Sequence, residues 1–244
     1  MLTWLQNDVN STNKEWVIAF WHHPPYTKGS HNSDTEIELI EMRQNALPIL
    51  EQAGVDLVLT GHSHSYERSY LIDGHYGSST TFTSSMKKDG GSGREDGTGS
   101  YKKPTDGKAP HEGAVYAVAG SSGKISGGTL DHPAMFISLN TLGSMVMDVN
   151  GNRLDAKFLT STGAIQDYFT VVKGTTVPVA PSNLTATAVS SSQINLAWTD
   201  NSSNETLFKI ERSTDGTNFS QIATVGSNVT SYSNTGLTAS TLYT

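Results

Sequence analysis

Short apolar runs and one helical pattern organise the first part of the chain. The runs Trp16–Trp21 and Val55–Thr60 predict two buried strands. Between them, apolar residues recur at helical spacing over residues 37–50, and Gly54 ends the pattern. Because Pro48 lies inside this stretch, we expect a kink or a break into two helices. A strand, a helix and a strand in this order predict a right-handed parallel crossover.

Two further patterns lie outside this crossover. Apolar positions 2, 5 and 9 predict one helix face ahead of the first strand. After residue 113, alternating apolar residues predict antiparallel strands at 115–119, 135–139, 144–149 and 154–159. The polar, glycine-rich segment 78–113 cannot fold alone, and it is either a lid or binding loop or a solvated insertion.

The composition changes near Lys173, where a linker is expected at residues 174–181. Beyond it, short alternating strands separated by turns predict a β-sandwich; the clearest are 184–188, 194–198 and 208–213. We therefore expect one domain over residues 1–173 and a second over residues 182–244.

Composition and charge exclude several classes of protein. A formal net charge of −7 disfavours nucleic acid as a partner. No apolar run approaches the length of a membrane span, and no signal peptide is visible. The absence of cysteine excludes disulfides and thiolate metal sites.

Histidines gather where the two expected parallel strands end. His22 follows the first strand, and His62 and His64 follow the second, in a turn that begins at Gly61. In an extended turn, residues two apart point the same way, so two imidazoles can face one spot. Neutral imidazole is the commonest side-chain metal ligand. The pattern therefore predicts a metal site at the carboxyl edge of the sheet.

Other polar residues have plainer interpretations. We expect His23 to pack or to cap. Asp56 is expected either to be satisfied by backbone contacts at a helix or loop or to support the metal ligands through hydrogen bonds. The segment Tyr66–Arg68 either orients the metal-binding histidines through outer contacts or forms an ordinary salt-bridged turn. Three isolated histidines are expected on the surface: His75, His111 and His132.

Two motifs stand out at the expected strand ends, namely His-His-Pro-Pro-Tyr at 22–26 and Gly-His-Ser-His-Ser-Tyr-Glu-Arg at 61–68. They resemble the calcineurin-like metallophosphoesterases, and most closely the purple acid phosphatase branch. Segments 113–123 and 143–149 also resemble that branch. The resemblance runs from about Leu2 to Val172 and implies an α/β fold, namely the C-terminal half of an αββα sandwich. The strands after the linker resemble a truncated, all-β fibronectin type III domain, with Trp198 as its core tryptophan and Tyr243 as its corner tyrosine.

The resemblance to metallophosphoesterases also implies a site. His22 and His62 would ligate one metal ion and His64 a second, with a bridging hydroxide between iron, zinc or manganese ions. His31 would contact the phosphate or protonate the leaving group. The implied activity is hydrolysis of phosphoric esters, by a phosphatase or a phosphodiesterase.

The family's Gly-Asp, Gly-Asp-x-x-Tyr and Gly-Asn-His segments do not precede His22 in this sequence. We therefore expect the chain to be a piece of an enzyme that lacks the Asp, Tyr and Asn ligands. The fibronectin type III module is of the kind appended to secreted bacterial enzymes, which suggests an extracellular protein and attachment to a surface or polymer. The alternative is a non-catalytic secreted binding or adhesion module that retains the fold.

Overall fold

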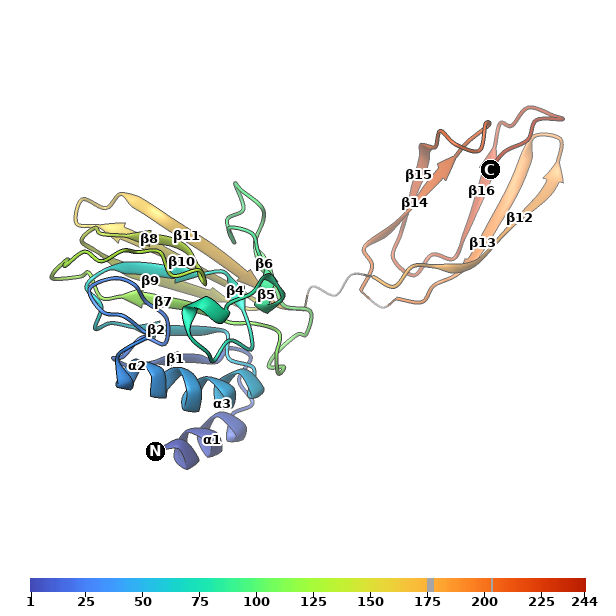
Figure 1. Ribbon diagram of the computed structural model, residues 1–244. Helices are drawn as coiled ribbons and strands as arrows, with labels where there is room; N and C mark the ends of the chain where they lie inside the picture. Colours follow the sequence, from blue (N-terminus) through green and yellow to red (C-terminus); the bar gives the residue numbers. More distant parts are fainter. Residues whose placement is uncertain (175–177, 203) are drawn as a thin grey trace. The chain divides into compact units, whose positions relative to one another are not determined.

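The computed structural model describes residues 1–174, 178–202 and 204–244, and the chain divides into two compact units (Figure 1). The first unit is Met1–Thr175 and the second is Thr176–Thr244. The linker expected at 174–181 falls partly on residues 175–177, which lie outside the described residues.

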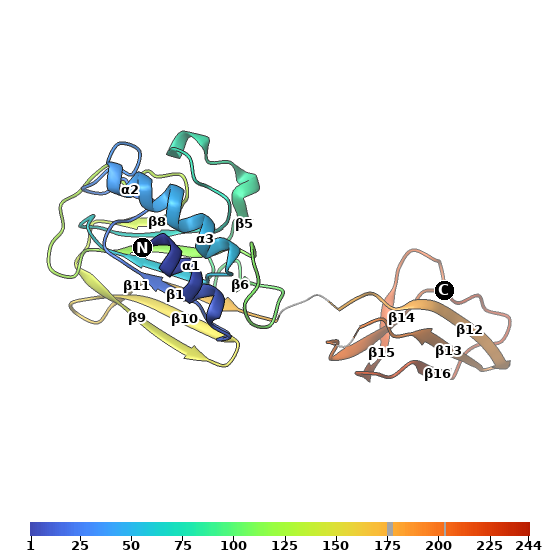
Figure 2. The ribbon, with the colours of Figure 1, turned by 90° about the horizontal axis from the view of Figure 1, so that it is seen from below.

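The helices of the first unit lie together on one side of its sheets (Figure 2). They are α1 (Leu2–Ser11), α2 (Ile37–Glu41) and α3 (Leu47–Gln52). A π-helical turn, η1 (Met42–Ala46), joins α2 directly to α3. Pro48 lies in the first turn of α3, and its missing N–H removes one helical hydrogen bond to the preceding turn. The expected interruption is therefore a widened turn between two helices.

A five-stranded sheet with the order β1-β2-β7-β3-β8 is the centre of the first unit. Its strands are β1 (Ile18–Phe20), β2 (Leu57–Thr60), β7 (Val115–Ala119), β3 (Tyr66–Ser69) and β8 (Met135–Leu139). The parallel pairing of β1 with β2 confirms that the predicted crossover is a parallel one. β7 is parallel to β2 and antiparallel to β3, so only one of its two pairings is the antiparallel one expected.

A second sheet has the order β6-β11-β10-β9. Its strands are β6 (Tyr101–Lys102), β11 (Ile165–Val172), β10 (Arg153–Thr160) and β9 (Gly143–Asn150). The remaining elements of this unit are β4 (Leu71–Ile72), β5 (Lys87–Asp89) and the 3₁₀ turns η2 (Ser79–Thr81) and η3 (Ser84–Met86).

The central sheet is covered on both faces, as Figures 1 and 2 show. On the helix side, Val58 packs in a buried cluster with Leu50 of α3. On the opposite side, Leu57 packs with Phe169 of the second sheet. Neighbouring residues of a strand point to opposite faces, so β2 contributes to both cores. The unit is a partial α/β sandwich of helices, sheet and sheet.

The polar segment 78–113 is partly built into this sandwich. Its strand β5 pairs with β4, and its strand β6 pairs with β11. Tyr101 and Lys103 are fully buried. At Tyr101 and Lys103, the segment is therefore packed into the fold and is neither a solvated insertion nor a free lid.

The burial of Lys103 is explained by its contact with Asp56. Its Oδ1 lies 2.6 Å from Lys103 Nζ, and its Oδ2 lies 2.8 Å from Lys173 Nζ. Oδ2 also accepts a hydrogen bond from the Val17 backbone N–H at 2.8 Å. Sequence reasoning predicted the backbone contact but not the two lysines. This buried cluster joins the starts of β1 and β2 to the ends of β6 and β11.

The second unit contains only β-structure in its described residues. A sheet of order β12-β13-β16 is formed by Ser182–Ser190, Gln193–Thr199 and Ser231–Thr235, and β14 (Leu207–Arg212) pairs with β15 (Ser220–Gly226). Trp198 is buried against Phe208, with ring centroids 5.5 Å apart. The Tyr243 hydroxyl accepts a hydrogen bond from the Thr238 N–H at 3.1 Å, a side-chain-to-backbone contact like that of a tyrosine corner.

Two of the three histidines expected on the surface are buried, so that expectation was wrong for His75 and His132. Their rings pack around Tyr26, at centroid distances of 5.4 and 5.5 Å. His75 is further held by a hydrogen bond to the Ser78 carbonyl. His111 is exposed, as expected.

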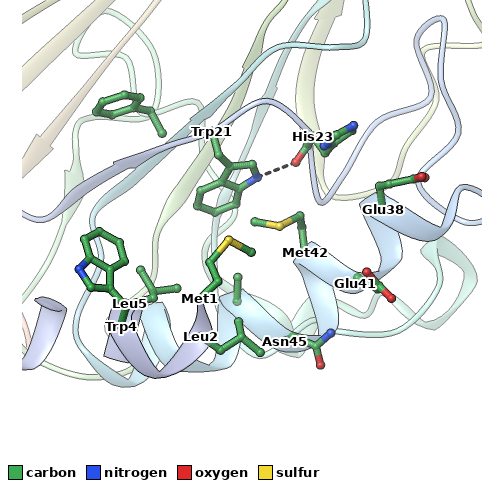
Figure 3. Close-up of a pocket in the computed structure, with 12 residues that line it drawn as sticks. Met1, Leu2, Trp4, Leu5, Trp21, His23, Glu38, Glu41, Met42 and Asn45 are labelled. Atoms are coloured by element: carbon green, nitrogen blue, oxygen red, sulfur yellow. Dashed lines mark hydrogen bonds between the residues drawn. The ribbon is translucent and has the colours of Figure 1, made fainter. Parts of the chain in front are cut away.

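β1 forms one edge of the central sheet, and it is not covered by another strand in the described residues. Phe20 on this strand is 81% exposed. An apolar cavity of about 440 Å³ lies beside it, and Figure 3 shows Trp21, Met1 and Met42 among the side chains that line it.

Within the described residues, no helix has the length and apolar character needed to cross a bilayer.

We predict that Asp56→Asn lowers the free energy of unfolding by about 3–5 kcal/mol, because two ammonium groups then stay buried without their carboxylate. Urea unfolding followed by circular dichroism measures this change. Asp148→Asn, at an exposed position of β9, is the matched control and should change stability little. Equal effects of the two substitutions would contradict the role given to Asp56.

We also predict that stability falls as the pH drops below about 6.5, the ordinary histidine pKa. Burial, with a smaller effect of His75, lowers the pKa of His132 to about 3. The unfolded chain therefore takes up a proton that the folded chain does not, which removes roughly 1.4 kcal/mol per pH unit between these two values.

His132→Asn tests this dependence, since the asparagine carbonyl can still accept the hydrogen bond that the Ala134 N–H donates to His132 Nδ1. The difference in unfolding free energy between pH 6 and pH 4 should shrink in this variant. It should stay unchanged in His111→Asn, and equal pH slopes for all three proteins would refute the prediction.

Candidate functional site

The paired strands β1 and β2 bring the two histidine turns together. Ile18, Ala19 and Phe20 lie opposite Leu57, Val58 and Leu59 in parallel register. Beyond the strands, the Gly61 N–H donates a hydrogen bond to the His22 carbonyl at 3.0 Å. His22 and the Gly61 turn are therefore fixed to one another through the backbone.

Three imidazoles converge at this edge. His22 Nε2 lies 3.0 Å from His62 Nδ1, and a nitrogen of His23 lies within 4.8 Å of both rings' ligand atoms. His23 was expected to pack or cap. β1 ends at Phe20, so strict strand alternation does not hold at residues 22 and 23, and both rings can face His62.

A second group shares the His62 ring. His31, Glu36 and His62 also place ligand atoms within 4.8 Å of one another. His31 Nδ1 lies 2.7 Å from Glu36 Oε2, and the His31 and His62 rings are 3.8 Å apart at their centroids. Sequence reasoning identified His31 and His62 but missed Glu36, whose only sequence signal is its position five residues after His31.

The backbone of the turn is constrained. His62 has φ of +61°, a conformation that costs most L-residues about 1–2 kcal/mol. Gly120 approaches the turn so closely that a Cβ there would meet the Ser63 carbonyl oxygen at 2.0 Å. Residues in this backbone conformation cluster at functional sites, where the surrounding structure holds them in place.

His64 lies outside both groups in the described part of the chain. Its backbone N–H donates to Ser30 Oγ at 2.9 Å, and its Nδ1 lies 2.9 Å from Ser126 Oγ. The structure thus brings His22, His62 and His31 together and gives His64 separate partners from two loops.

Strand alternation separates the roles of residues 66–68. Tyr66 and Arg68 both bind Asp167 of the second sheet, the Arg68 Nε at 2.5 Å and the tyrosine hydroxyl at 2.8 Å. Glu67 faces the other way and accepts hydrogen bonds from Thr27, Ser65 and the Lys28 N–H. Glu67 therefore holds the loop that carries His31, directly beneath the histidine turn.

The charges around the site favour neutral imidazole at its centre. Burial, aided by the neighbouring histidines His31, His23 and His22, lowers the pKa of His62. Partial burial pushes the pKa of Glu36 upward, but hydrogen bonds from the Asn32 N–H and His31 outweigh it and hold that pKa below its usual value. Burial raises the pKa of Glu67.

These residues fit a metal ion of the zinc type. Imidazole nitrogens bind zinc at about 2.0–2.1 Å, so two such ligands on a tetrahedral ion are roughly 3.3 Å apart. The 3.0 Å between His22 Nε2 and His62 Nδ1 is close to that separation. A neutral His62 also presents a free lone pair to a cation.

Comparisons with known proteins show what each part of the chain is similar to. Residues 2–66 match the calcineurin-like phosphoesterase family, and residues 179–244 match the fibronectin type III domain. Purple acid phosphatase 18 of Arabidopsis thaliana is 33% identical over 75 residues, which cover 29% of this chain and 16% of that protein. An uncharacterised protein of Mycobacterium tuberculosis is 32% identical over 81 residues, covering 32% of this chain and 15% of that protein.

Purple acid phosphatase PPD1 from seeds of yellow lupin (Lupinus luteus) has a similar fold, with a TM-score of 0.53 and 14% identity. The likeness covers 73% of this chain and 30% of the lupin chain. The matched segments thus span about one sixth of the curated relatives quoted above. The N-terminal unit is thus similar in part to the calcineurin-like phosphoesterases and to the purple acid phosphatases, and residues 179–244 are similar to a fibronectin type III domain.

Proposed function

We propose that this chain is part of a metal-dependent phosphoesterase that hydrolyses phosphoric esters at the edge where β1 and β2 end. The observation that carries the proposal is the 3.0 Å approach of His22 Nε2 to His62 Nδ1, made by residues that follow two neighbouring parallel strands. These two histidines would hold one ion, and His64 would hold a second ion beside it. Bound metal would supply Lewis acidity and a water of lowered pKa.

His31 is the proposed proton donor to the leaving group. Its side chain is 31% exposed, so a substrate can reach it. Its Nδ1 is engaged by Glu36, which leaves Nε2 for the substrate. Glu67 has a supporting role, because its hydrogen bonds to Thr27 and Lys28 fix the start of the loop that presents His31.

The remaining metal ligands would come from residues outside this sequence. The small share of the relatives' length that the chain matches supports this part of the proposal. We further propose iron, zinc or manganese as the metal and an extracellular location for the whole protein. The fibronectin type III domain would then attach it to a surface or polymer.

We predict that the purified chain binds about one zinc ion weakly and that His62→Ala weakens binding by more than about 100-fold, since even partners that only support a ligand account for 10–100-fold. Isothermal titration calorimetry after chelator treatment measures the affinity. His111→Gln is the control, because His111 belongs to a separate donor group with Glu51 and Asp73. Loss of binding in the control rather than in His62→Ala would place the metal elsewhere.

We predict that the whole protein hydrolyses phosphate monoesters and that His31→Ala lowers its kcat by about 10²–10⁴-fold, the usual contribution of a general acid. The loss should be larger for an alkyl phosphate than for p-nitrophenyl phosphate, because nitrophenolate leaves without a proton. Equal losses for both esters would assign His31 to binding. Metal uptake by the whole protein without hydrolysis of either ester would favour a non-catalytic binding module.

A further inference from the structure

We propose that Glu36 is a positioning residue that holds His31 and His62 in complementary tautomers, an inference that rests on the metal site proposed above. A single carboxylate oxygen faces both rings. Glu36 Oε2 lies 2.7 Å from His31 Nδ1 and 3.8 Å from His62 Nε2. The proposed leaving-group acid and a proposed metal ligand therefore share one partner.

The carboxylate is held in this orientation from its other oxygen. Glu36 Oε1 accepts a hydrogen bond from the Asn32 N–H at 2.7 Å. Glu36 is also the N-cap residue of α2, yet its side chain makes no capping hydrogen bond to that helix. Ser, Thr, Asp and Asn are the residues that cap well, so helix formation does not account for a glutamate at this position.

The contact with His31 sets the position of that ring's proton. An ionised carboxylate only accepts hydrogen bonds, so His31 must carry hydrogen on Nδ1 to make the 2.7 Å contact. The neutral ring then presents the Nε2 lone pair to the substrate side, and protonation there yields the acid that the reaction needs.

The contact with His62 has the opposite consequence. His62 Nδ1 is the nitrogen that faces His22 Nε2, and His62 Nε2 is the nitrogen that faces Glu36. A hydrogen on Nε2 is favoured by the nearby carboxylate and leaves the Nδ1 lone pair for a metal ion. Histidines that bind metals commonly have their other nitrogen oriented by a carboxylate in this way. Glu36 thus selects the Nδ1–H form of one ring and the Nε2–H form of the other.

The decisive experiment is imidazole ¹⁵N NMR on the metal-free chain with histidine labelled, near neutral pH. Two-bond ¹H–¹⁵N spectra distinguish the two tautomers of each ring. The wild-type chain should show His31 as Nδ1–H and His62 as Nε2–H. Glu36→Gln keeps the side-chain shape and an acceptor for the Asn32 N–H but removes the charge, and both rings should move toward a mixture of tautomers.

Glu38→Gln is the matched control, since Glu38 is an exposed glutamate in α2, two positions after Glu36. Its spectra should equal those of the wild type. Glu36→Asp, which is one methylene shorter, should repeat the change seen in Glu36→Gln and serves if that variant folds poorly. Unchanged tautomers in both Glu36 variants would overturn the proposal.

Zinc titration separates this inference from the proposed function. Glu36→Gln should bind zinc about 10–100-fold more weakly than the wild type, and Glu38→Gln should bind equally well. If the wild-type chain and the whole protein bind no zinc, the proposed function fails while the metal-free spectra still decide the role of Glu36. Equal zinc affinity in Glu36→Gln and the wild type would overturn the role assigned to Glu36 at His62.

Discussion

The pairing of one buried carboxylate with two buried lysines is the constraint on which the first unit depends. Asp56 lies between the two sheets, and Lys103 and Lys173 reach it from β6 and from the end of β11. Buried ions are tolerated only when each has its partners in place. The second sheet is therefore fixed against the start of β2. The other end of this short strand carries the histidine turn, whose position follows from the same contact.

The Tyr-Glu-Arg segment that follows the histidine turn performs two tasks at once. Arg68 forms a fully buried ion pair with Asp167 and so ties β3 to the second sheet. Glu67, one residue earlier, points to the other face and supports the loop before His31. Both contacts are possible because neighbouring side chains of a strand point to opposite faces of the sheet. The motif therefore couples the packing of the sandwich to the placement of the loop that carries His31.

Local patterns in the sequence were sufficient to predict the parallel crossover. They also predicted that His22 and His62 lie close together, because parallel strands end at a common edge of the sheet. They were insufficient where a residue's surroundings come from distant segments. The burial of His132 depends on Tyr26, and the burial of Lys103 depends on Asp56. Glu36 was missed for the same kind of reason, since one of the two rings beside it, His62, is 26 residues away in the sequence.

No strand pairs with the outer edge of β1 among the residues that the structure describes, and this edge affects how the polypeptide behaves in solution. A strand edge presents unpaired N–H and C=O groups, and here it lies next to the 81% exposed ring of Phe20 and an apolar cavity. Such surfaces promote association of chains through their edges. Colloidal stability, and not only the free energy of unfolding, is thus expected to limit the concentration at which the chain stays dispersed.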